Sequence, residues 1–218
     1  MRVINLFYHW FEEPGCVNIF LKKTFQQSLI KLALAKERSV GGSTRSLAAK
    51  LGVNVRTIFR WQSYESKGML IKHLIKVCDY LNLLYTDLEK QHWIESIGNP
   101  NMNKEKMIVH PKFPFELSNK KVAEIIGYAM SDGHISSRDY HFSYGSQDIN
   151  QIKRIIFLIN EVCGNVKCRI IRKKNNFIYV VFPPTIGRML KKAGAPIGNK
   201  SCLNPSLPHW IKYVGPKE

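Results

Sequence analysis

The segment from Glu124 to His134 (EIIGYAMSDGH) places a glycine inside an apolar run and ends in Asp-Gly-His. The apolar spacing predicts a helix, in which Gly127 lets another helix backbone approach closely and Gly133 ends the helix. Asp132 then falls in the last turn, where the helix dipole disfavours an anion by about 0.3–1 kcal/mol. A divalent cation would compensate this charge, so we interpret Asp132, with Gly133 beside it, as a metal position. The alternative is an ordinary core helix that ends in Asp-Gly.

The charge of the chain is strongly basic, with 33 Lys and Arg against 16 Asp and Glu, a net charge of +17 and a pI of about 9.8. The excess is spread over both halves, which predicts a polyanionic partner, most simply nucleic acid. A soluble basic protein without such a partner is the alternative. An anionic membrane is disfavoured, because no basic amphipathic helix stands apart from the folded pattern.

The five cysteines are odd in number and scattered, which argues against a disulfide framework and against structural zinc. The N-terminus lacks the pattern of a signal peptide, and no apolar run reaches the roughly 18 residues of a membrane span. We therefore expect an intracellular, cytoplasmic protein without a membrane partner or a small-molecule substrate.

Residues 43–61 have the pattern of two short helices joined by a tight turn at Gly52, with Ser43 as the N-cap of the first. The second helix of such a pair can lie in the DNA major groove. Arg45 and Lys50 are candidate phosphate contacts. The side chains off the apolar stripe are candidate base contacts, and these are Asn54, Arg56, Phe59, Arg60 and Ser63. A helical hairpin with solvated basic residues remains the alternative.

The flanking residues extend this pattern with helices over Phe25–Ala35 and Met69–Leu81 and a capping box at Thr86 to Glu89. Together these elements resemble the lambda-repressor-like (Cro/C1-type) domain family, and the resemblance covers roughly residues 23–93. It implies sequence-specific DNA binding, most simply by a dimer. We predict an N-terminal extension (1–22), a helix-turn-helix domain (23–95), a linker without regular structure (96–117) and a second domain (118–218).

The second domain alternates helical and strand patterns, with Ser118 as the expected cap of the first helix. The predicted order is αββαββα, so the whole chain is expected to be α+β, an all-α domain followed by this one. After the helix that ends near Ser131, the predicted elements are a strand pair over 134–146, a helix over 147–162, strands at 166–172 and 177–182, and a short helix at 186–192.

This order, the Glu124–His134 segment, and the tail segments Gly194–Ser201 and Pro208–Ile211 resemble one half-domain of the LAGLIDADG (DOD-type) homing endonucleases. The resemblance covers residues 118–211. It implies a saddle-shaped sheet in the DNA major groove and two motif helices packed together, each final Asp holding Mg²⁺. With one motif per chain it implies a homodimer, in which Gly127 lies at the helix pair and Asp132 meets its symmetry mate.

Sheet residues become candidate DNA contacts under this resemblance, and these are Arg138, Tyr140, Tyr144, Lys167, Arg169, Arg172, Lys173, Lys174 and Tyr179. Strand alternation places Lys167, Arg169 and Ile171 on one face. The opposite face then carries Cys168, Ile170 and Arg172, so the basic pair can face a groove while the apolar pair faces helices. A solvated sheet face is the alternative.

Two departures from the family pattern concern catalysis. The lysine that often follows the second strand is absent, because Tyr144 and Gly145 stand there, and Met130 replaces the first acidic residue of the motif. His134 and His141 can assist catalysis or bind metal, although such histidines are more often surface or sheet contacts.

The chain stops at residues 215–218, where a second motif helix would begin. It is either a single-motif dimer or the front part of a split or decayed gene. The leading hypothesis is a site-specific, Mg²⁺-dependent DNA endonuclease. The alternative is a non-cutting regulator, as in sporulation regulators that join a degenerate LAGLIDADG domain to a helix-turn-helix. An RNA-splicing maturase follows only from family analogy.

Overall fold

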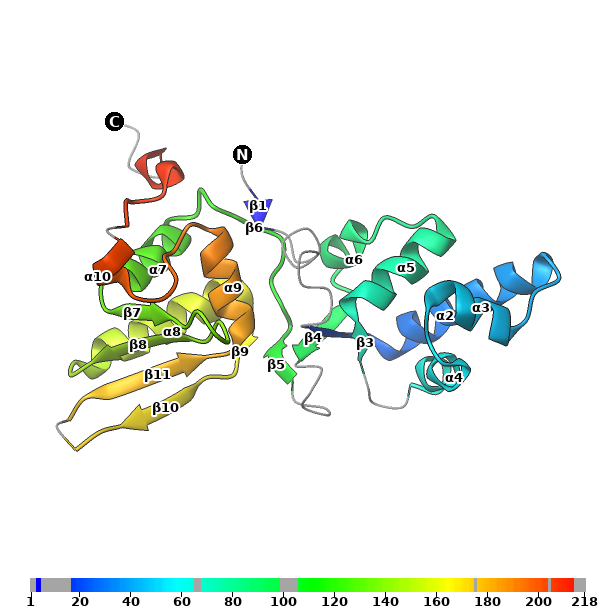
Figure 1. Ribbon diagram of the computed structural model, residues 1–218, viewed down its shortest axis with the longest axis horizontal. Coiled ribbons are helices and arrows are strands. Elements are labelled where there is room, and N and C mark those ends of the chain that lie inside the picture. Colours follow the sequence, from blue (N-terminus) through cyan, green and yellow to red (C-terminus); the bar gives the residue numbers. More distant parts are fainter. Residues whose placement is uncertain are drawn as a thin grey trace. The chain divides into compact units, whose positions relative to one another are not determined.

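The computed structural model describes residues 3–4, 17–64, 68–98, 106–174, 176–203 and 205–213 (Figure 1). The chain divides into two compact units. Leu6–Pro111 form the first, which we call the helical unit, and Met1–Asn5 with Lys112–Glu218 form the second, which we call the sheet unit. Both contain helices and an antiparallel sheet, which confirms the mixed α and β character predicted from the sequence.

The described residues of the helical unit form five helices where the sequence predicts them. Ser43 caps the second by accepting the backbone N–H of Ser46, Gly52 ends it in the left-handed region at φ 69°, and Asn54 caps the third. The helices are α2 (Lys23–Ser39), α3 (Thr44–Leu51), α4 (Val55–Ser63), α5 (Ile71–Leu81) and α6 (Thr86–Lys90). The capping box expected at Thr86 does not form, because α6 begins after Tyr85, which makes no side-chain cap bond.

The helical unit also contains four strands that pair antiparallel in the order β3-β2-β4-β5. Its strands are β2 (Asn18–Leu21), β3 (Met69–Leu70), β4 (Ile94–Gly98) and β5 (Lys106–Val109). The prediction that residues 96–117 lack regular structure is therefore wrong. Ile19, Ile97 and Ile108 are fully buried in this sheet, and their burial outweighs the nearby Gly and Pro signals. Residues 1–2 and 5–16 of the expected extension lie outside the described residues.

The sheet unit has the helix and strand order predicted from its sequence, with additional short elements. The predicted order corresponds to α7 (Lys120–Met130), β7 (Gly133–Ile135), β8 (Phe142–Ser146), α8 (Ile149–Cys163), β10 (Arg169–Arg172), β11 (Ile178–Phe182) and α9 (Pro184–Lys192). The additional elements are β1 (Val3–Ile4) paired with β6 (Phe115–Glu116), β9 (Asn165–Val166), α10 (Lys200–Leu203) and the 3₁₀ helix η1 (His209–Tyr213). Residues 214–218, where the chain stops, lie outside the described residues.

The main sheet of this unit is antiparallel, in the order β10-β11-β8-β7, and α7, α8 and α9 pack against it (Figure 1). One row across the sheet is Ile170, Val180, Tyr144 and Gly133. We call its face the helix face, because Val180 and Tyr144 are buried there against the helices. The next row, Arg169, Val181, Ser143 and His134, lies on the opposite face, which we call the open face.

Two expected roles at the ends of α7 are wrong. Asn119, rather than Ser118, caps the helix, with its Oδ1 accepting the N–H of Lys121 at 2.9 Å. Gly133 does not end the helix in a left-handed conformation, since Ser131 is the C-cap. Gly133 is needed for packing instead, because a Cβ there would lie 2.6 Å from the carbonyl oxygen of Tyr128.

Candidate nucleic-acid interface and metal position

The outer side of α4 presents the side chains predicted to contact DNA. Ile58 and Trp61 are buried on the inner side and fix the helix against the core. Arg56, Phe59 and Ser63 are exposed, and the exposed fraction of Phe59 is 53%. Arg45 on α3 is also exposed, and Arg60 is half-buried. The i, i+3 and i+7 spacing of Arg56, Phe59 and Ser63 puts these three exposed side chains on one face of α4.

Asn54 has a structural role that the sequence reading missed. Its Oδ1 accepts the backbone N–H of Arg56 at 2.9 Å, which satisfies one of the free N–H groups in the first turn of α4. Asn54 remains exposed at the start of α4. A substitution here therefore changes both the stability of α4 and any contact made by the side chain.

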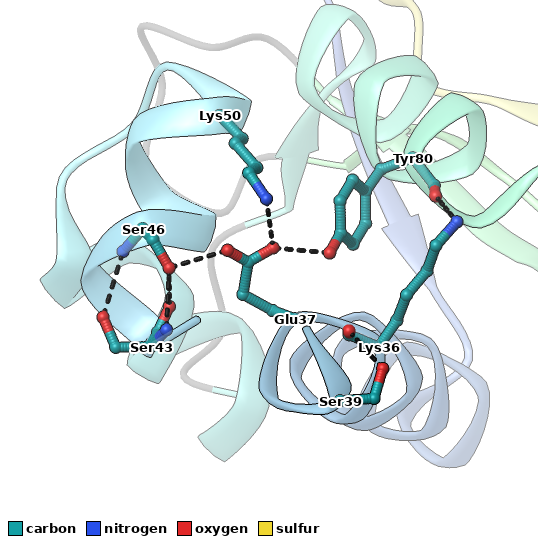
Figure 2. A network of polar contacts seen from close by, with 7 residues as sticks. All are labelled: Lys36, Glu37, Ser39, Ser43, Ser46, Lys50 and Tyr80. Carbon is teal, nitrogen blue, oxygen red and sulfur yellow. Dashed lines mark hydrogen bonds and ion pairs between the residues drawn. The ribbon is translucent and has the colours of Figure 1, made fainter. Parts of the chain in front are cut away.

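A buried carboxylate joins three helices of the helical unit, as Figure 2 shows. Oε1 of Glu37 on α2 accepts the hydroxyl of Ser46 on α3 at 2.7 Å. Oε2 accepts Lys50 Nζ at 2.8 Å and the hydroxyl of Tyr80 on α5 at 2.5 Å. Since the Glu37 side chain is only 2% exposed, these bonds replace water around its charge.

The network holds Glu37 ionised. Its hydrogen bonds from Lys50, then Tyr80, then Ser46 lower its pKa to about 2, and the bond to Glu37 raises the pKa of Tyr80 to about 12. Lys50, which was expected to contact phosphate, instead forms an ion pair with Glu37, although half of its side chain remains exposed. The network fixes α3 on α2 and α5, and thereby the scaffold on which α4 rests.

The C-terminal end of α7 carries the expected metal position. Asp132 is exposed in the turn that follows the helix. Gly127, also exposed, has no atom of the described residues within 4 Å of the place where a Cβ would stand. Packing within the described part of the chain therefore does not require a glycine at this position.

Lys200 is a residue that sequence reasoning missed beside Asp132. Its Nζ donates to the carbonyl oxygens of Ala129 at 3.3 Å, Met130 at 3.2 Å and Ser131. Burial lowers the pKa of Lys200, and the negative charge of Asp132 opposes that shift. The positive charge of this ammonium balances the negative end of the helix dipole, a role that the sequence analysis gave to a metal ion. The helix dipole therefore does not by itself require a metal ion at this position. Its only sequence signal was membership of the Gly194–Ser201 segment.

The open face of the sheet receives some of the predicted contacts. Arg169 lies in the open-face row, whereas Arg172 falls on the helix-face side of the edge strand β10. Ile170, expected to pack under helices, is 51% exposed, because strand β10 is at the edge of the sheet. The predicted basic side chains Arg138, Lys167, Arg169, Arg172, Lys173 and Lys174 are all exposed.

Two of the three predicted tyrosine contacts are held within the unit. Tyr144 is 2% exposed on the helix face, and its hydroxyl donates to Gln151 Oε1 at 2.6 Å, so we withdraw it as a DNA contact. Its pKa is raised by burial and by the charge of Asp132. Tyr140 is half-buried under the cations of Arg188 and Lys191, which lie 4.9 and 5.2 Å from its ring centre.

Two aromatic rings lie over Gly145, a contact that strand patterning does not reveal. Phe177 and Tyr179 have ring centres 4.9 Å apart. A Cβ on Gly145 would lie 2.5 Å from the Cε1 atom of Phe177 and 2.7 Å from the Cε1 atom of Tyr179. Lys173 Nζ lies 4.7 Å from the Tyr179 ring centre. The predicted contacts Lys173 and Tyr179 therefore form one cation–aromatic cluster.

The described residues contain no group of three or more His, Cys, Asp or Glu side chains arranged to hold a metal ion. His134 is exposed on the open face, while His141 pairs with Asp139 at 3.0 Å (Nδ1 to Oδ2). In the described part of the chain, Asp132 is the carboxylate that directly follows the α7 end.

Comparison with known proteins gives no relative, since no family model and no curated protein matches this chain. Both family resemblances therefore remain predictions from sequence. Within the described ranges, none of the helices has the length and apolar composition that a bilayer crossing requires.

Proposed function

We propose that this protein binds a specific double-stranded DNA site as a homodimer and cuts it with Mg²⁺ as cofactor. The observation that carries DNA binding is the outer side of α4, where Arg56 and Phe59 are exposed on a helix anchored by Trp61. A rigid helix can place an arginine against the edge of guanine, which it bonds bidentately.

Charge supports the same proposal. The chain carries +17, and its exposed basic side chains lie in both units, on α3 and α4 and along β10 and its hairpin turn. Contacts to phosphates give affinity that falls steeply with salt, whereas Arg56 and Phe59 on α4 would supply sequence preference.

Asp132 suits Mg²⁺ as a ligand, because its carboxylate is exposed and Mg²⁺ prefers oxygen donors. Mg²⁺ sites often use one or two carboxylates together with water and substrate phosphates. We propose that Asp132 from two copies and the DNA phosphates complete the site, with Gly127 at the contact between the copies. When bound, Mg²⁺ would favour ionisation of the attacking water and stabilise charge on the leaving oxygen.

The second candidate function is a DNA-binding regulator that does not cut. Lys200 favours it, since its ammonium already balances the negative end of α7 without a metal. Both functions require specific DNA binding, and they differ only in whether the bound duplex is broken.

One experiment separates these functions. DNA bound by the protein is selected from a random library, and the selected duplex is incubated with Mg²⁺. For the nuclease we expect a staggered cut that Asp132→Asn reduces more than about 100-fold while Kd changes less than about twofold. Specific binding without any cut supports the regulator.

The DNA-binding surface is tested with the same duplex. Arg56→Ala is expected to weaken binding by about 10- to 100-fold and to relax selection at one base position. Lys153→Ala, at an exposed lysine of α8, is the matched control. If the two variants bind equally well, α4 is not the reading helix.

A further inference from the structure

Strand β10 is the outermost strand of the main sheet, and one of its two edges is open. It pairs with β11 on one side, and among the described residues no strand lies along its other side (Figure 1). Alternate residues of an antiparallel strand turn their backbone N–H and C=O groups away from the paired neighbour. The outer edge of β10 therefore offers a row of backbone donors and acceptors to which a further strand can bond.

The two edges of this sheet differ in how they are covered. At the β7 edge, the carbonyl oxygen of Ile135 already accepts the N–H of Gly198 at 2.8 Å. At the β10 edge, Arg169 and Arg172 are exposed, and Ile170 between them is 51% exposed on the helix-face side. Of the two edges, β10 is thus the one that can accept another chain.

The charge around β10 has one sign. Residues 162–217 contain no Asp or Glu, and the strand has the sequence Arg-Ile-Ile-Arg. The ion pairs of the described residues use other cations than Arg169 and Arg172. Antiparallel pairing with β10 of a second copy is disfavoured. In the register that places the isoleucines opposite each other, each arginine faces an arginine, and like charges in opposite positions destabilise a sheet.

We propose that β10 is a docking edge for an extended segment of a partner protein, with side chains in the order acidic, apolar, apolar, acidic. In antiparallel pairing, the acidic residues stand opposite Arg169 and Arg172, and the apolar residues stand opposite Ile170 and Ile171. The backbone bonds of such an added strand give affinity, and its side chains give specificity. The added strand also covers the exposed side chain of Ile170.

Nucleic acid suits the arginines of this edge but not its other groups. Phosphate oxygens accept bonds from arginine, yet a sugar–phosphate backbone lacks the alternating donors and acceptors of a β-strand. A duplex lying on the open face can reach Arg169, whereas Ile170 lies on the helix-face side and stays uncovered. Exposed backbone groups and an exposed isoleucine together favour a peptide as the occupant.

Peptide probes test the docking edge with the unsubstituted, full-length protein. A short fluorescent peptide with Glu-Val-Val-Glu at its centre is titrated by fluorescence anisotropy in the absence of DNA. Its Lys-Val-Val-Lys counterpart should bind at least about tenfold more weakly, because two attractive cross-strand pairs become repulsive. Absence of saturable binding by the first peptide, or equal binding by both, overturns the inference.

Methylation of the peptide backbone separates strand addition from charge attraction. Only alternate residues of the peptide bond to β10, so N-methylation should abolish binding at one valine and change Kd less than about twofold at the other. If the two methylated peptides bind equally, the inference is overturned. Displacement by a short DNA duplex together with that equality would assign the edge to nucleic acid instead.

Charge reversal gives the matching test on the protein. The double variant Arg169→Glu/Arg172→Glu should bind Lys-Val-Val-Lys more tightly than Glu-Val-Val-Glu. The control Lys120→Glu/Lys153→Glu changes the net charge equally at exposed positions of α7 and α8, and it should keep the original preference. The same reversal in both double variants would contradict the inference. Peptide binding is measured without DNA, so this inference and the proposed nuclease function can fail independently.

Discussion

Each unit has a carboxylate near the C-terminal end of a helix, but one carboxylate is buried and the other is exposed. Glu37 in the helical unit is buried and accepts bonds from Ser46, Lys50 and Tyr80. Asp132 in the sheet unit is exposed, and the neighbouring ammonium of Lys200 bonds to backbone carbonyls instead. A carboxylate surrounded by donors has no free capacity for a ligand, whereas an exposed one keeps its oxygens available.

Two lysines show that the net charge overstates the charge that is free to bind a polyanion. Lys50 and Lys200 both contribute to the net charge of +17, yet each is bound within its own unit. The charge offered to a polyanion is therefore smaller than composition indicates. Exposed basic residues such as Arg56 and Lys174 are better guides to the interface.

The largest effect on stability is expected from Glu37→Gln. Glutamine removes the charge and places an amide donor among three side chains that all donate, so Tm should fall by about 10 °C. Calorimetry measures the fall, and hydrogen exchange of the α3 amides locates it in the helical unit. Glu124→Gln, which breaks an exposed pair with Arg154, should change Tm far less.

The stability of Glu37→Gln should also depend on pH differently from that of the unsubstituted protein. The pKa of Glu37 is lowered from 4.5 to about 2 in the folded chain, so its stabilising effect is complete above pH 4.5 and is lost as the pH falls towards 2. Unfolding curves of Glu37→Gln should therefore lack this part of the acid dependence. An unchanged acid profile would show that the carboxylate is not held by these donors.

A smaller effect is expected from Tyr144→Phe, which tests the buried tyrosine on the helix face. Loss of the bond to Gln151 should cost about 1 kcal/mol of the free energy of unfolding, and DNA affinity should not change. Denaturant titration and binding to the selected duplex measure the two quantities. Tyr179→Phe on the open face is the control. Weaker DNA binding by Tyr144→Phe alone would restore Tyr144 as a contact.

The smallest effect on stability is expected from Asp132→Asn. An exposed carboxylate next to the negative end of α7 contributes little to folding, so the free energy of unfolding should change by less than about 0.5 kcal/mol. Chemical denaturation checks this value. A loss as large as that of Glu37→Gln would assign Asp132 a structural role and remove the contrast between the two carboxylates.

The sequence by itself determined the local elements. Apolar periodicity, the Ser43 cap and the left-handed Gly52 turn fix α3 and α4, and period-two alternation fixes β8 and β11. These signals act between residues near each other in the chain, so they can be read without knowing the fold. The exposed outer side of α4 follows from them as well, because burial of one stripe leaves the other in solvent.

Only the tertiary structure decided which side chains are free. Glu37 bonds to Tyr80, and Lys200 bonds to the end of α7, across separations in the chain that no local pattern encodes. Strand β10 lies at a sheet edge, so Ile170 is exposed although its alternation predicts burial. Hydrogen bonding and burial depend on which distant elements meet, and that is set by the packing of the whole unit.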